Sequence, residues 1–168
     1  GNGGSIKTSA KQINLTSGLL SVDSRLGSGG LIDIEGKKVA LLNANLSAKG
    51  NQMGGNIRVG GEFQGGKRQN YTTDKEYFGF VNRFGKLSKI SNAEQTYVDN
   101  NSSIDISSRS GSGGAAVIWS ERVTDYNGSI QANGRFNDDD NKFKDGGFVE
   151  ISSKENLRTV DLTKTYVK

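Results

Sequence analysis

Apolar residues recur along this chain in pairs that are two residues apart, and each series of pairs follows two adjacent glycines. When the first glycine of each pair is counted as position 0, inward-type residues occupy positions 3 and 5 in repeats that begin at residues 3, 29, 54, 113 and 146. Further pairs follow at positions 10 and 12 and at positions 17 and 19, such as Val39 with Leu41 and Leu46 with Ala48. A spacing of two is the period of a β-strand with one buried face. Each repeat is therefore predicted to hold three short strands joined by tight corners.

The glycine pairs also define the period of the array. Successive pairs are 26, 25, 59 and 33 residues apart, which indicates a repeat of about 25 residues with two insertions. Three short strands cannot bury their apolar faces alone, whereas stacked repeats bury them in one continuous column. The chain is therefore predicted to be a single all-β domain over residues 1–168, a parallel β-helix of three strands per coil and about five coils.

Three finer expectations follow from this count. In the first repeat it places Ile13 and Leu15 inward. The glycine pairs are expected to turn a corner with positive φ at one residue, which glycine allows without steric cost. We identify no segment with apolar residues at i, i+3, i+4 and i+7, so no helix is expected. The alternative of an antiparallel sandwich with two-residue hairpins gives no reason for the repeat.

One long insertion, at residues 65–96, interrupts the third repeat, and a short acidic loop at residues 135–145 lengthens the fourth. The long insertion holds five of the thirteen aromatic residues and a net charge of +3. We expect it to pack on the β-helix or to project from it. The strand at residues 115–119 is apolar on both faces, so Val117 and Trp119 need cover. Aromatic residues of the insertion are predicted to fold over them.

The motifs between these elements have a familiar order. They are GGNIRVGGEFQGGK at residues 54–67, SIDISSRSGSGGAAVIWSERVTDYNGSIQANG at 103–134 and GGFVEISSKENL at 146–157. Over residues 29–158 this succession resembles the secreted exoproteins of bacterial two-partner secretion, the filamentous haemagglutinin family, and especially its high-molecular-weight adhesins. The chain departs from that pattern in residues 149–153, where the family often has VETSG, and in the length of its insertion.

The resemblance implies a right-handed parallel β-helix that is exported through an outer-membrane two-partner secretion transporter. It implies a protein that is secreted or displayed at the bacterial cell surface, with an adhesive or stalk-like role in virulence. The family's secretion domain carries asparagine–proline motifs. Because this chain has no proline, it is expected to be a passenger segment. No cofactor is expected.

Composition narrows the chemistry further. The chain has no cysteine and no histidine, which removes thiol catalysis, the commonest general base and the commonest metal ligand. No apolar run is long enough to span a membrane. A polysaccharide-active β-helix needs clustered carboxylates, whereas the outward acids are scattered over different strands: Asp33, Glu35, Asp105 and Glu150. No enzyme activity is expected. Most of the net charge of +4 lies in the insertion, and a nucleic-acid partner is not expected.

The insertion is the place where the sequence suggests binding. Its basic and aromatic residues could hold an acidic glycan or a nucleic acid by stacking and charge, and the first candidates are Arg68, Tyr71, Tyr77 and Arg83. The plainer alternative is a packed lid with solvated lysines. The three aspartates at residues 138–140 could bind Ca²⁺, but the EF-hand pattern is absent and a solvated loop is the favoured interpretation.

Three functional hypotheses follow. The first is a non-catalytic segment of a secreted bacterial surface adhesin, a scaffold that binds a host-cell glycan or protein receptor through residues 65–96. The second is a pure structural stalk of a large exoprotein. The third is a polysaccharide-active β-helix enzyme.

Overall fold

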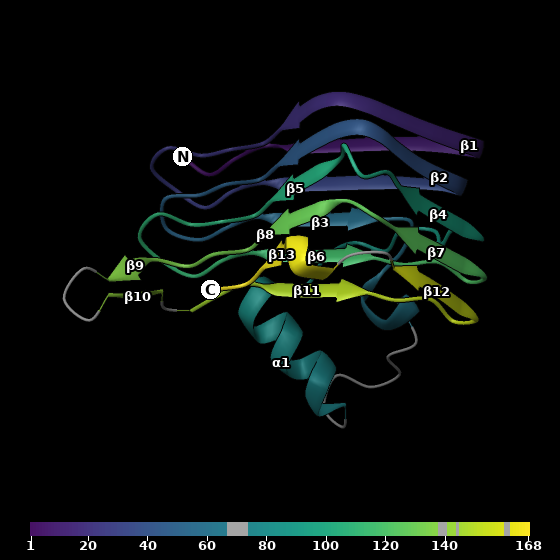
Figure 1. The fold of residues 1–168 in the computed structure, drawn as a ribbon. Coiled ribbons are helices and arrows are strands. Elements are labelled where there is room, and N and C mark those ends of the chain that lie inside the picture. The colour runs from purple at the N-terminus through teal and green to yellow at the C-terminus, as the bar shows by residue number, and fades with distance from the viewer. Residues whose placement is uncertain (67–73, 138–140, 144, 160–161) are drawn as a thin grey trace.

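The computed structural model describes residues 1–168 except 67–73, 138–140, 144 and 160–161 (Figure 1). The strands are β1 (Ser5–Ser21), β2 (Leu31–Ser47), β3 (Asn56–Val59), β4 (Gln95–Val98), β5 (Ser103–Asp105), β6 (Ala115–Ile118), β7 (Val123–Tyr126), β8 (Ser129–Gln131), β9 (Phe136–Asn137), β10 (Lys142–Phe143), β11 (Phe148–Ile151), β12 (Asn156–Thr159) and β13 (Thr165–Tyr166). One α-helix, α1 (Lys75–Phe84), and two 3₁₀ turns, Phe63–Gly66 and Leu162–Lys164, complete the described elements.

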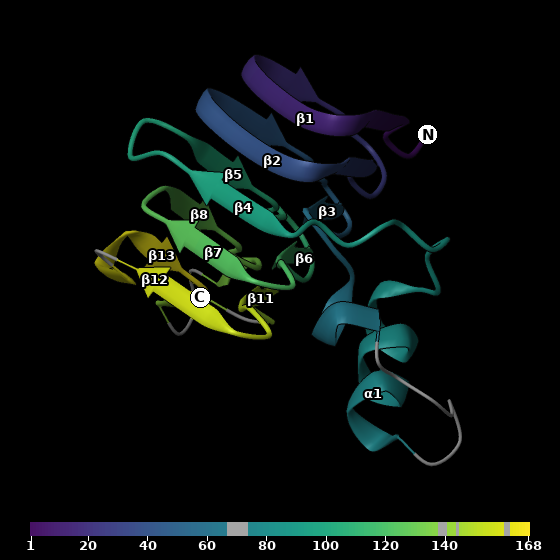
Figure 2. The same cartoon turned by 90° about the vertical axis from the view of Figure 1, so that its right-hand side faces the viewer.

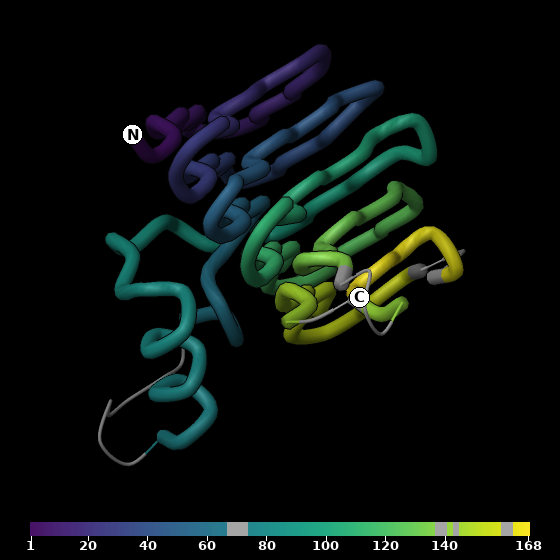
Figure 3. The backbone as a smooth tube through the Cα atoms, turned by 90° about the vertical axis from the view of Figure 1, so that its left-hand side faces the viewer, coloured from purple at the N-terminus to yellow at the C-terminus, as the bar shows by residue number. Residues whose placement is uncertain are grey.

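The strands stack in parallel on three faces. The first face has the order β1-β2-β3-β6-β11, the second β1-β2-β4-β7-β12 and the third β1-β2-β5-β8-β13. The long strands β1 and β2 each bend around all three faces, so each is one complete coil (Figures 2 and 3). The protein is a parallel β-helix with three strands per coil and five coils in its described part.

The interior is a continuous apolar column. On the first face Ile32 pairs with Ile57, and Ile57 pairs with Ala116. On the third face Leu46 pairs with Ile104, which pairs with Ile130. All of these side chains are buried. The predicted inward positions 3 and 17 are thereby confirmed in these coils. Each column runs along the axis of the β-helix, and neighbouring residues in a column are about 4.8 Å apart, the spacing between adjacent strands.

The first coil differs from the prediction on its second face. Ile13 and Leu15 point outward and are 64% and 60% exposed, so their assignment to the interior was wrong. Asn14 and Thr16 occupy the inward positions instead. A β-bulge between Ala10 and Ile13 adds one residue to β1. Because side chains alternate between faces, a slip of one residue exchanges the inner and outer sets.

The glycine pairs are required for a reason other than the expected positive φ, which none of them has. Each pair closes a coil: the amide of Gly55 donates to the carbonyl of Ala48 at 2.7 Å. A Cβ atom on Gly55 would lie 2.1 Å from the Gly30 carbonyl oxygen, and one on Gly114 would lie 1.9 Å from the Gly55 carbonyl oxygen. The corners of successive coils stack backbone on backbone, and a side chain would separate them.

The expectation that no helix forms was wrong. The insertion does contain apolar residues at i, i+3, i+4 and i+7, and α1 forms on them: Tyr77, Phe80, Val81 and Phe84. Asp74 caps the helix by accepting a hydrogen bond from the Tyr77 amide, and Gly85 ends it with φ of 84°. In the part of the chain that the structure describes, no helix has the length and apolar character needed to cross a membrane.

Candidate functional site

The insertion packs α1 against the outside of the fourth and fifth coils. Trp119 is 3% exposed and Val117 1%, which confirms that this strand is covered on its outer face. They form one buried cluster with Phe63 and Tyr77, and Phe148 of β11 packs against it. The chain rejoins the β-helix at β4, so the last residues of the expected range 65–96 belong to a strand of the second face.

Stacked aromatic rings fix the position of α1. The ring of Phe63 is stacked on Phe80, with centroids 4.4 Å apart and planes inclined by 6°. Phe148 meets both rings edge-on, at 5.6 Å from Phe63 and 5.4 Å from Phe80. Offset-stacked and edge-on pairs add to the stabilisation that burial of the rings provides. These contacts join the insertion to the first face of the fifth coil.

A buried polar network holds the returning part of the insertion across the first face. Arg58 donates two hydrogen bonds of 2.7 Å to the carboxylate of Asp33 and one of 2.8 Å to the Ser88 carbonyl. The carboxylate of Glu62 accepts the amide of Ile90 at 3.0 Å. The segment after α1 is therefore bound to the scaffold through its backbone.

Glu35 adds a further tie between the same segment and the first two coils. Its carboxylate accepts the Ser91 amide at 2.8 Å and lies 2.9 Å from the Lys7 ammonium. Burial alone would raise the pKa of Glu35, but the hydrogen bonds from Lys7 and Ser91, together with the charge of Lys7, lower it below its ordinary value. The side chain is therefore held ionised in the folded protein.

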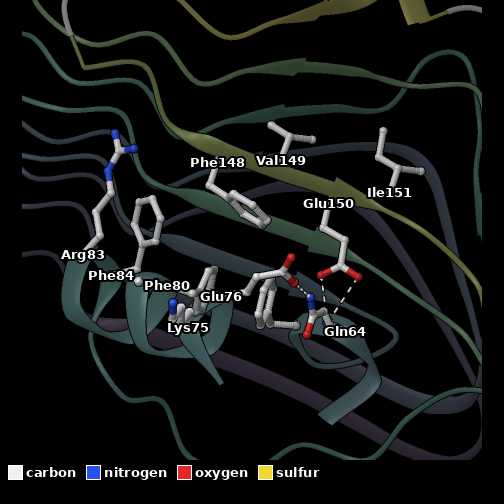
Figure 4. A pocket seen from close by; sticks show the side chains of 12 residues that line it. Gln64, Lys75, Glu76, Phe80, Arg83, Phe84, Phe148, Val149, Glu150 and Ile151 are labelled. Atoms are coloured by element: carbon white, nitrogen blue, oxygen red, sulfur yellow. Dashed lines mark hydrogen bonds between the residues drawn. The ribbon is translucent and has the colours of Figure 1, made fainter. Parts of the chain in front are cut away.

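A cleft of about 750 Å³ lies between α1 and β11 (Figure 4). Its apolar wall consists of four phenylalanines together with Val149 and Ile151 of β11. Its polar groups come from the turn before the insertion, from α1 and from β11. The phenylalanines are Phe63, Phe80, Phe84 and Phe148, and the polar residues are Gln64, Lys75, Glu76, Arg83 and Glu150. An apolar recess with a few convergent polar groups is the usual form of a small-ligand site.

Gln64 lies between the two carboxylates of the cleft. Its side-chain amide donates to Glu76, and its backbone amide donates to Glu150 at 2.9 Å. Glu150 also accepts the Ser152 hydroxyl at 2.6 Å. Burial raises the pKa of Glu150, and these two hydrogen bonds oppose the shift only in part. The charged form of Glu150 is therefore disfavoured in the cleft.

Of the four predicted site residues, the structure brings only one to the cleft. Arg83 lines the cleft, donates to the Gly146 carbonyl and lies over the Phe84 ring at 5.0 Å. Tyr77 is in the buried cluster beneath, 6% exposed, where a ligand in the cleft does not reach it. Arg68 and Tyr71 lie outside the described residues.

Sequence reasoning missed Phe63, Gln64 and Phe148 as parts of the site. One signal was available: Phe148 occupies the outward position 2 of its repeat, where the earlier repeats have Ser5, Leu31, Asn56 and Ala115. A large apolar side chain on an outer face calls for a covering element. Gln64 gave no such signal, because its role depends on a contact with a residue 86 positions away.

The remaining acidic candidates do not form a catalytic or metal-binding cluster. Asp33 is committed to Arg58, and Asp105 lies on the third face. Among the residues that the structure describes, no three acidic side chains lie close enough to hold a metal ion. The segment at 135–145 contains an antiparallel hairpin of β9 and β10. The aspartates proposed to bind Ca²⁺, at 138–140, lie outside the described residues.

The fold and its coil-closing glycines define the class as parallel β-helix proteins. No protein-family model and no curated protein matches the chain. Among solved structures it is similar to the crystal structure of the HMW1 secretion domain from Haemophilus influenzae, with a TM-score of 0.71 and 25% identity. The match covers 98% of this chain but 37% of that chain. This structural similarity supports the predicted relation to two-partner secretion exoproteins at the level of the fold.

Proposed function

We propose that this chain is a non-catalytic segment of a secreted bacterial surface adhesin, in which the coils hold the cleft beneath α1 for a glycan of a host cell. The observation that carries the proposal is the insertion itself. The other four coils close without it, yet a hydrogen bond from the buried Arg58 to the Ser88 carbonyl and an aromatic cluster hold it in place. A pure stalk needs no clamped helix with a cleft of about 750 Å³ beside it.

The likeness to the HMW1 secretion domain supports export by two-partner secretion. The partner would then be an outer-membrane transporter, and the protein would be released or displayed at the cell surface. The absence of proline, and with it of the family's asparagine–proline motifs, supports a passenger segment over the secretion domain to which the fold is similar.

The chemistry of the cleft fits a saccharide. A sugar ring presents an apolar C–H face that packs on aromatic rings, and hydroxyl groups that hydrogen-bond to charged and amide side chains. Phe80 and Phe84 supply the aromatic wall, and Lys75, Glu76 and Gln64 supply donors and acceptors. Because the cations and carboxylates of the cleft nearly balance, the ligand is not required to carry a high charge.

A variant that fills the cleft tests this proposal. Gly79 lines the cleft, and a Cβ atom there would meet nothing within 4 Å. Gly79→Leu should therefore block the cleft and raise the helix propensity of α1 without strain. Asn82→Leu, on the exposed side of the same helix, is the matched control. On a glycan array and on host cells, Gly79→Leu should lower binding at least tenfold and Asn82→Leu should leave it unchanged.

Other outcomes select the other hypotheses. If neither this segment nor the full-length secreted protein binds cells or glycans, the segment is a stalk. If binding survives Gly79→Leu, the cleft is not the site. Release of reducing ends or unsaturated products from polysaccharides, lost in Glu76→Gln or Glu150→Gln, would make the protein an enzyme.

A further inference from the structure

A second groove lies at the corner where the third face of one coil leads into the next. It has a volume of about 640 Å³ and is lined by the corner loops of the first three coils. The lining residues are Asp23, Ser24, Arg25, Lys49, Gly50, Asn51, Ser107, Ser108 and Arg109. We propose that this basic groove binds a linear polysaccharide that carries sulfate or phosphate esters. The site is separate from the α1 cleft and belongs to the scaffold itself.

The corner loops stack in register, which gives the groove a fixed shape. The Ser24 amide donates to the Lys49 carbonyl at 2.8 Å, and the Gly50 amide donates to the Ser107 carbonyl at 3.1 Å. The Arg109 amide donates to the Gly50 carbonyl at 3.1 Å. A preformed groove loses little conformational entropy when a ligand binds.

The stacking also places two arginines at equivalent positions. Arg25, Asn51 and Arg109 are each the third residue after the last inward residue of the third face in successive coils. Arg25 and Arg109 are thus two coils apart, on the order of 10 Å between their backbones. Asn51 lies between them, and Gly50 adds no side chain to the groove.

The charges of the groove leave these two arginines available. Lys49 is shared between the carboxylates of Asp23 and Asp105, at 3.8 and 3.9 Å. Asp23 also accepts the Lys49 amide at 2.7 Å. By contrast, Arg25 and Arg109 are exposed, and no described residue forms a side-chain hydrogen bond or ion pair with either. The groove therefore has an excess of positive charge with two unengaged guanidinium groups.

The class of ligand follows from these groups. A guanidinium binds two oxygens of one oxyanion in a fork, and two arginines along the helix axis fit anionic groups repeated along a chain. The Ser107 hydroxyl accepts the Asn133 amide at 3.2 Å, which leaves its proton to donate to a third oxygen or a sugar hydroxyl. The lining holds no aromatic residue, so nucleobases would find no stacking partner there. A polysaccharide fits better than a nucleic acid.

The test measures binding of the purified chain to immobilised dextran sulfate, phosphorylated dextran, neutral dextran and single-stranded DNA. Both esterified dextrans should bind, with an affinity that falls as salt rises, and neutral dextran should not. Tighter binding to dextran sulfate or to phosphorylated dextran shows whether the groove prefers sulfate or phosphate esters. Arg25→Gln and Arg109→Gln should each weaken binding about tenfold, as expected for loss of a charge-assisted hydrogen bond. Arg122→Gln removes the same charge from an exposed position outside the groove and should change binding less than twofold.

Three results would overturn the proposal. They are an equal loss of affinity in Arg122→Gln, equal binding of single-stranded DNA, and absence of binding to both esterified dextrans. Circular dichroism spectra that match the unsubstituted protein establish that each variant is folded. Gly79→Leu should leave binding to the esterified dextrans unchanged, so that failure of this proposal and failure of the α1 cleft as a glycan site give different results.

Discussion

The guanidinium of Arg58 and the carboxylate of Asp33 join neighbouring coils through two hydrogen bonds of 2.7 Å beneath the insertion. Both side chains are buried, at 5% and 4% exposure. Arg58 also donates to the Ser88 carbonyl, so the same pair holds the insertion on the scaffold. Removing one partner leaves a buried charge without its counter-charge, which costs far more than the pair contributes in total.

Arg58→Met should therefore lower the free energy of unfolding by about 3–5 kcal/mol. It should also make the segment after α1 accessible to proteases under native conditions, since Ser88 loses its donor. Urea unfolding and limited proteolysis measure the two effects. The control is the double variant Arg58→Met with Asp33→Leu, which removes both members of this pair and should recover part of the loss. It also removes the positive charge that lies 4.0 Å from the buried carboxylate of Glu62, so recovery should not be complete. A single variant within about 1 kcal/mol of the unsubstituted protein would show that the pair contributes little.

The glycine corners lead to a second prediction. In Gly114→Ala the new methyl group would lie 1.9 Å from the Gly55 carbonyl oxygen, a backbone atom that cannot move without separating two coils. We expect a loss of about 3 kcal/mol, the upper end of the cost of overpacking, measured by urea unfolding. Gly4→Ala is the control, because a Cβ there meets nothing within 4 Å, and it should stay within about 0.5 kcal/mol. Equal effects of the two substitutions would contradict the close-approach explanation.

Much of the scaffold could be predicted because its signal is local and repeated. The alternation of apolar and polar residues is visible within each strand, and the glycine pairs mark where each coil begins. The exception is the second face of the first coil. There Ile13 and Leu15 alternate as an inward pair would, and only the pairing of β1 with β2 shows that a bulge has turned them outward. A local pattern cannot reveal a register that neighbouring strands determine.

The candidate site could be predicted less well, because its parts meet only in three dimensions. The sequence indicated that Trp119 needed cover and which insertion would supply it. The helical spacing of Tyr77 and Phe84 was present but overlooked. The approach of Gln64 to Glu150 across 86 residues depends on where the insertion docks, and no local pattern encodes that.

The corrected register of the first coil predicts opposite outcomes for two leucines. Leu41 is buried in the column of the second coil, whereas Leu15 in the first coil is 60% exposed. Leu41→Ala should cost about 2–5 kcal/mol, since it leaves a cavity. Leu15→Ala should cost no more than about 0.5 kcal/mol. Thermal unfolding of both variants measures the difference, and a comparable cost would restore the inward assignment of Leu15.

Trp119, the only tryptophan in the chain, reports on the cover that the insertion provides. Replacing residues 64–92 by a short glycine–serine linker should expose the indole, shift its fluorescence emission to longer wavelength and increase quenching by acrylamide. Phe80→Ala, which removes one ring of the cluster, should give a smaller change in the same direction. The control Asn82→Leu should leave the emission unchanged. Unaltered emission after removal of the segment would mean that other elements bury Trp119.

Two glutamates should influence stability with opposite pH dependence. The folded pKa of Glu150 is raised by burial, so its stabilising contribution is complete below its unfolded pKa, about 4.3, and is lost as the pH rises through the folded value. The folded pKa of Glu35 is lowered, because hydrogen bonds from Lys7 and Ser91 and the charge of Lys7 outweigh its burial. Its contribution is present above about pH 4.3 and is lost as the pH falls through the folded value.

The difference in unfolding free energy between the unsubstituted protein and a glutamine variant isolates each effect. For Glu150→Gln this difference should fall between pH 4 and pH 8, and the variant should be relatively more stable at neutral pH. For Glu35→Gln it should rise from strongly acidic pH to about pH 5, because only the ionised carboxylate holds both Lys7 and the Ser91 amide. Urea unfolding at several pH values gives both curves. If they slope in the same direction, one of the two carboxylates does not have the environment that the structure assigns to it.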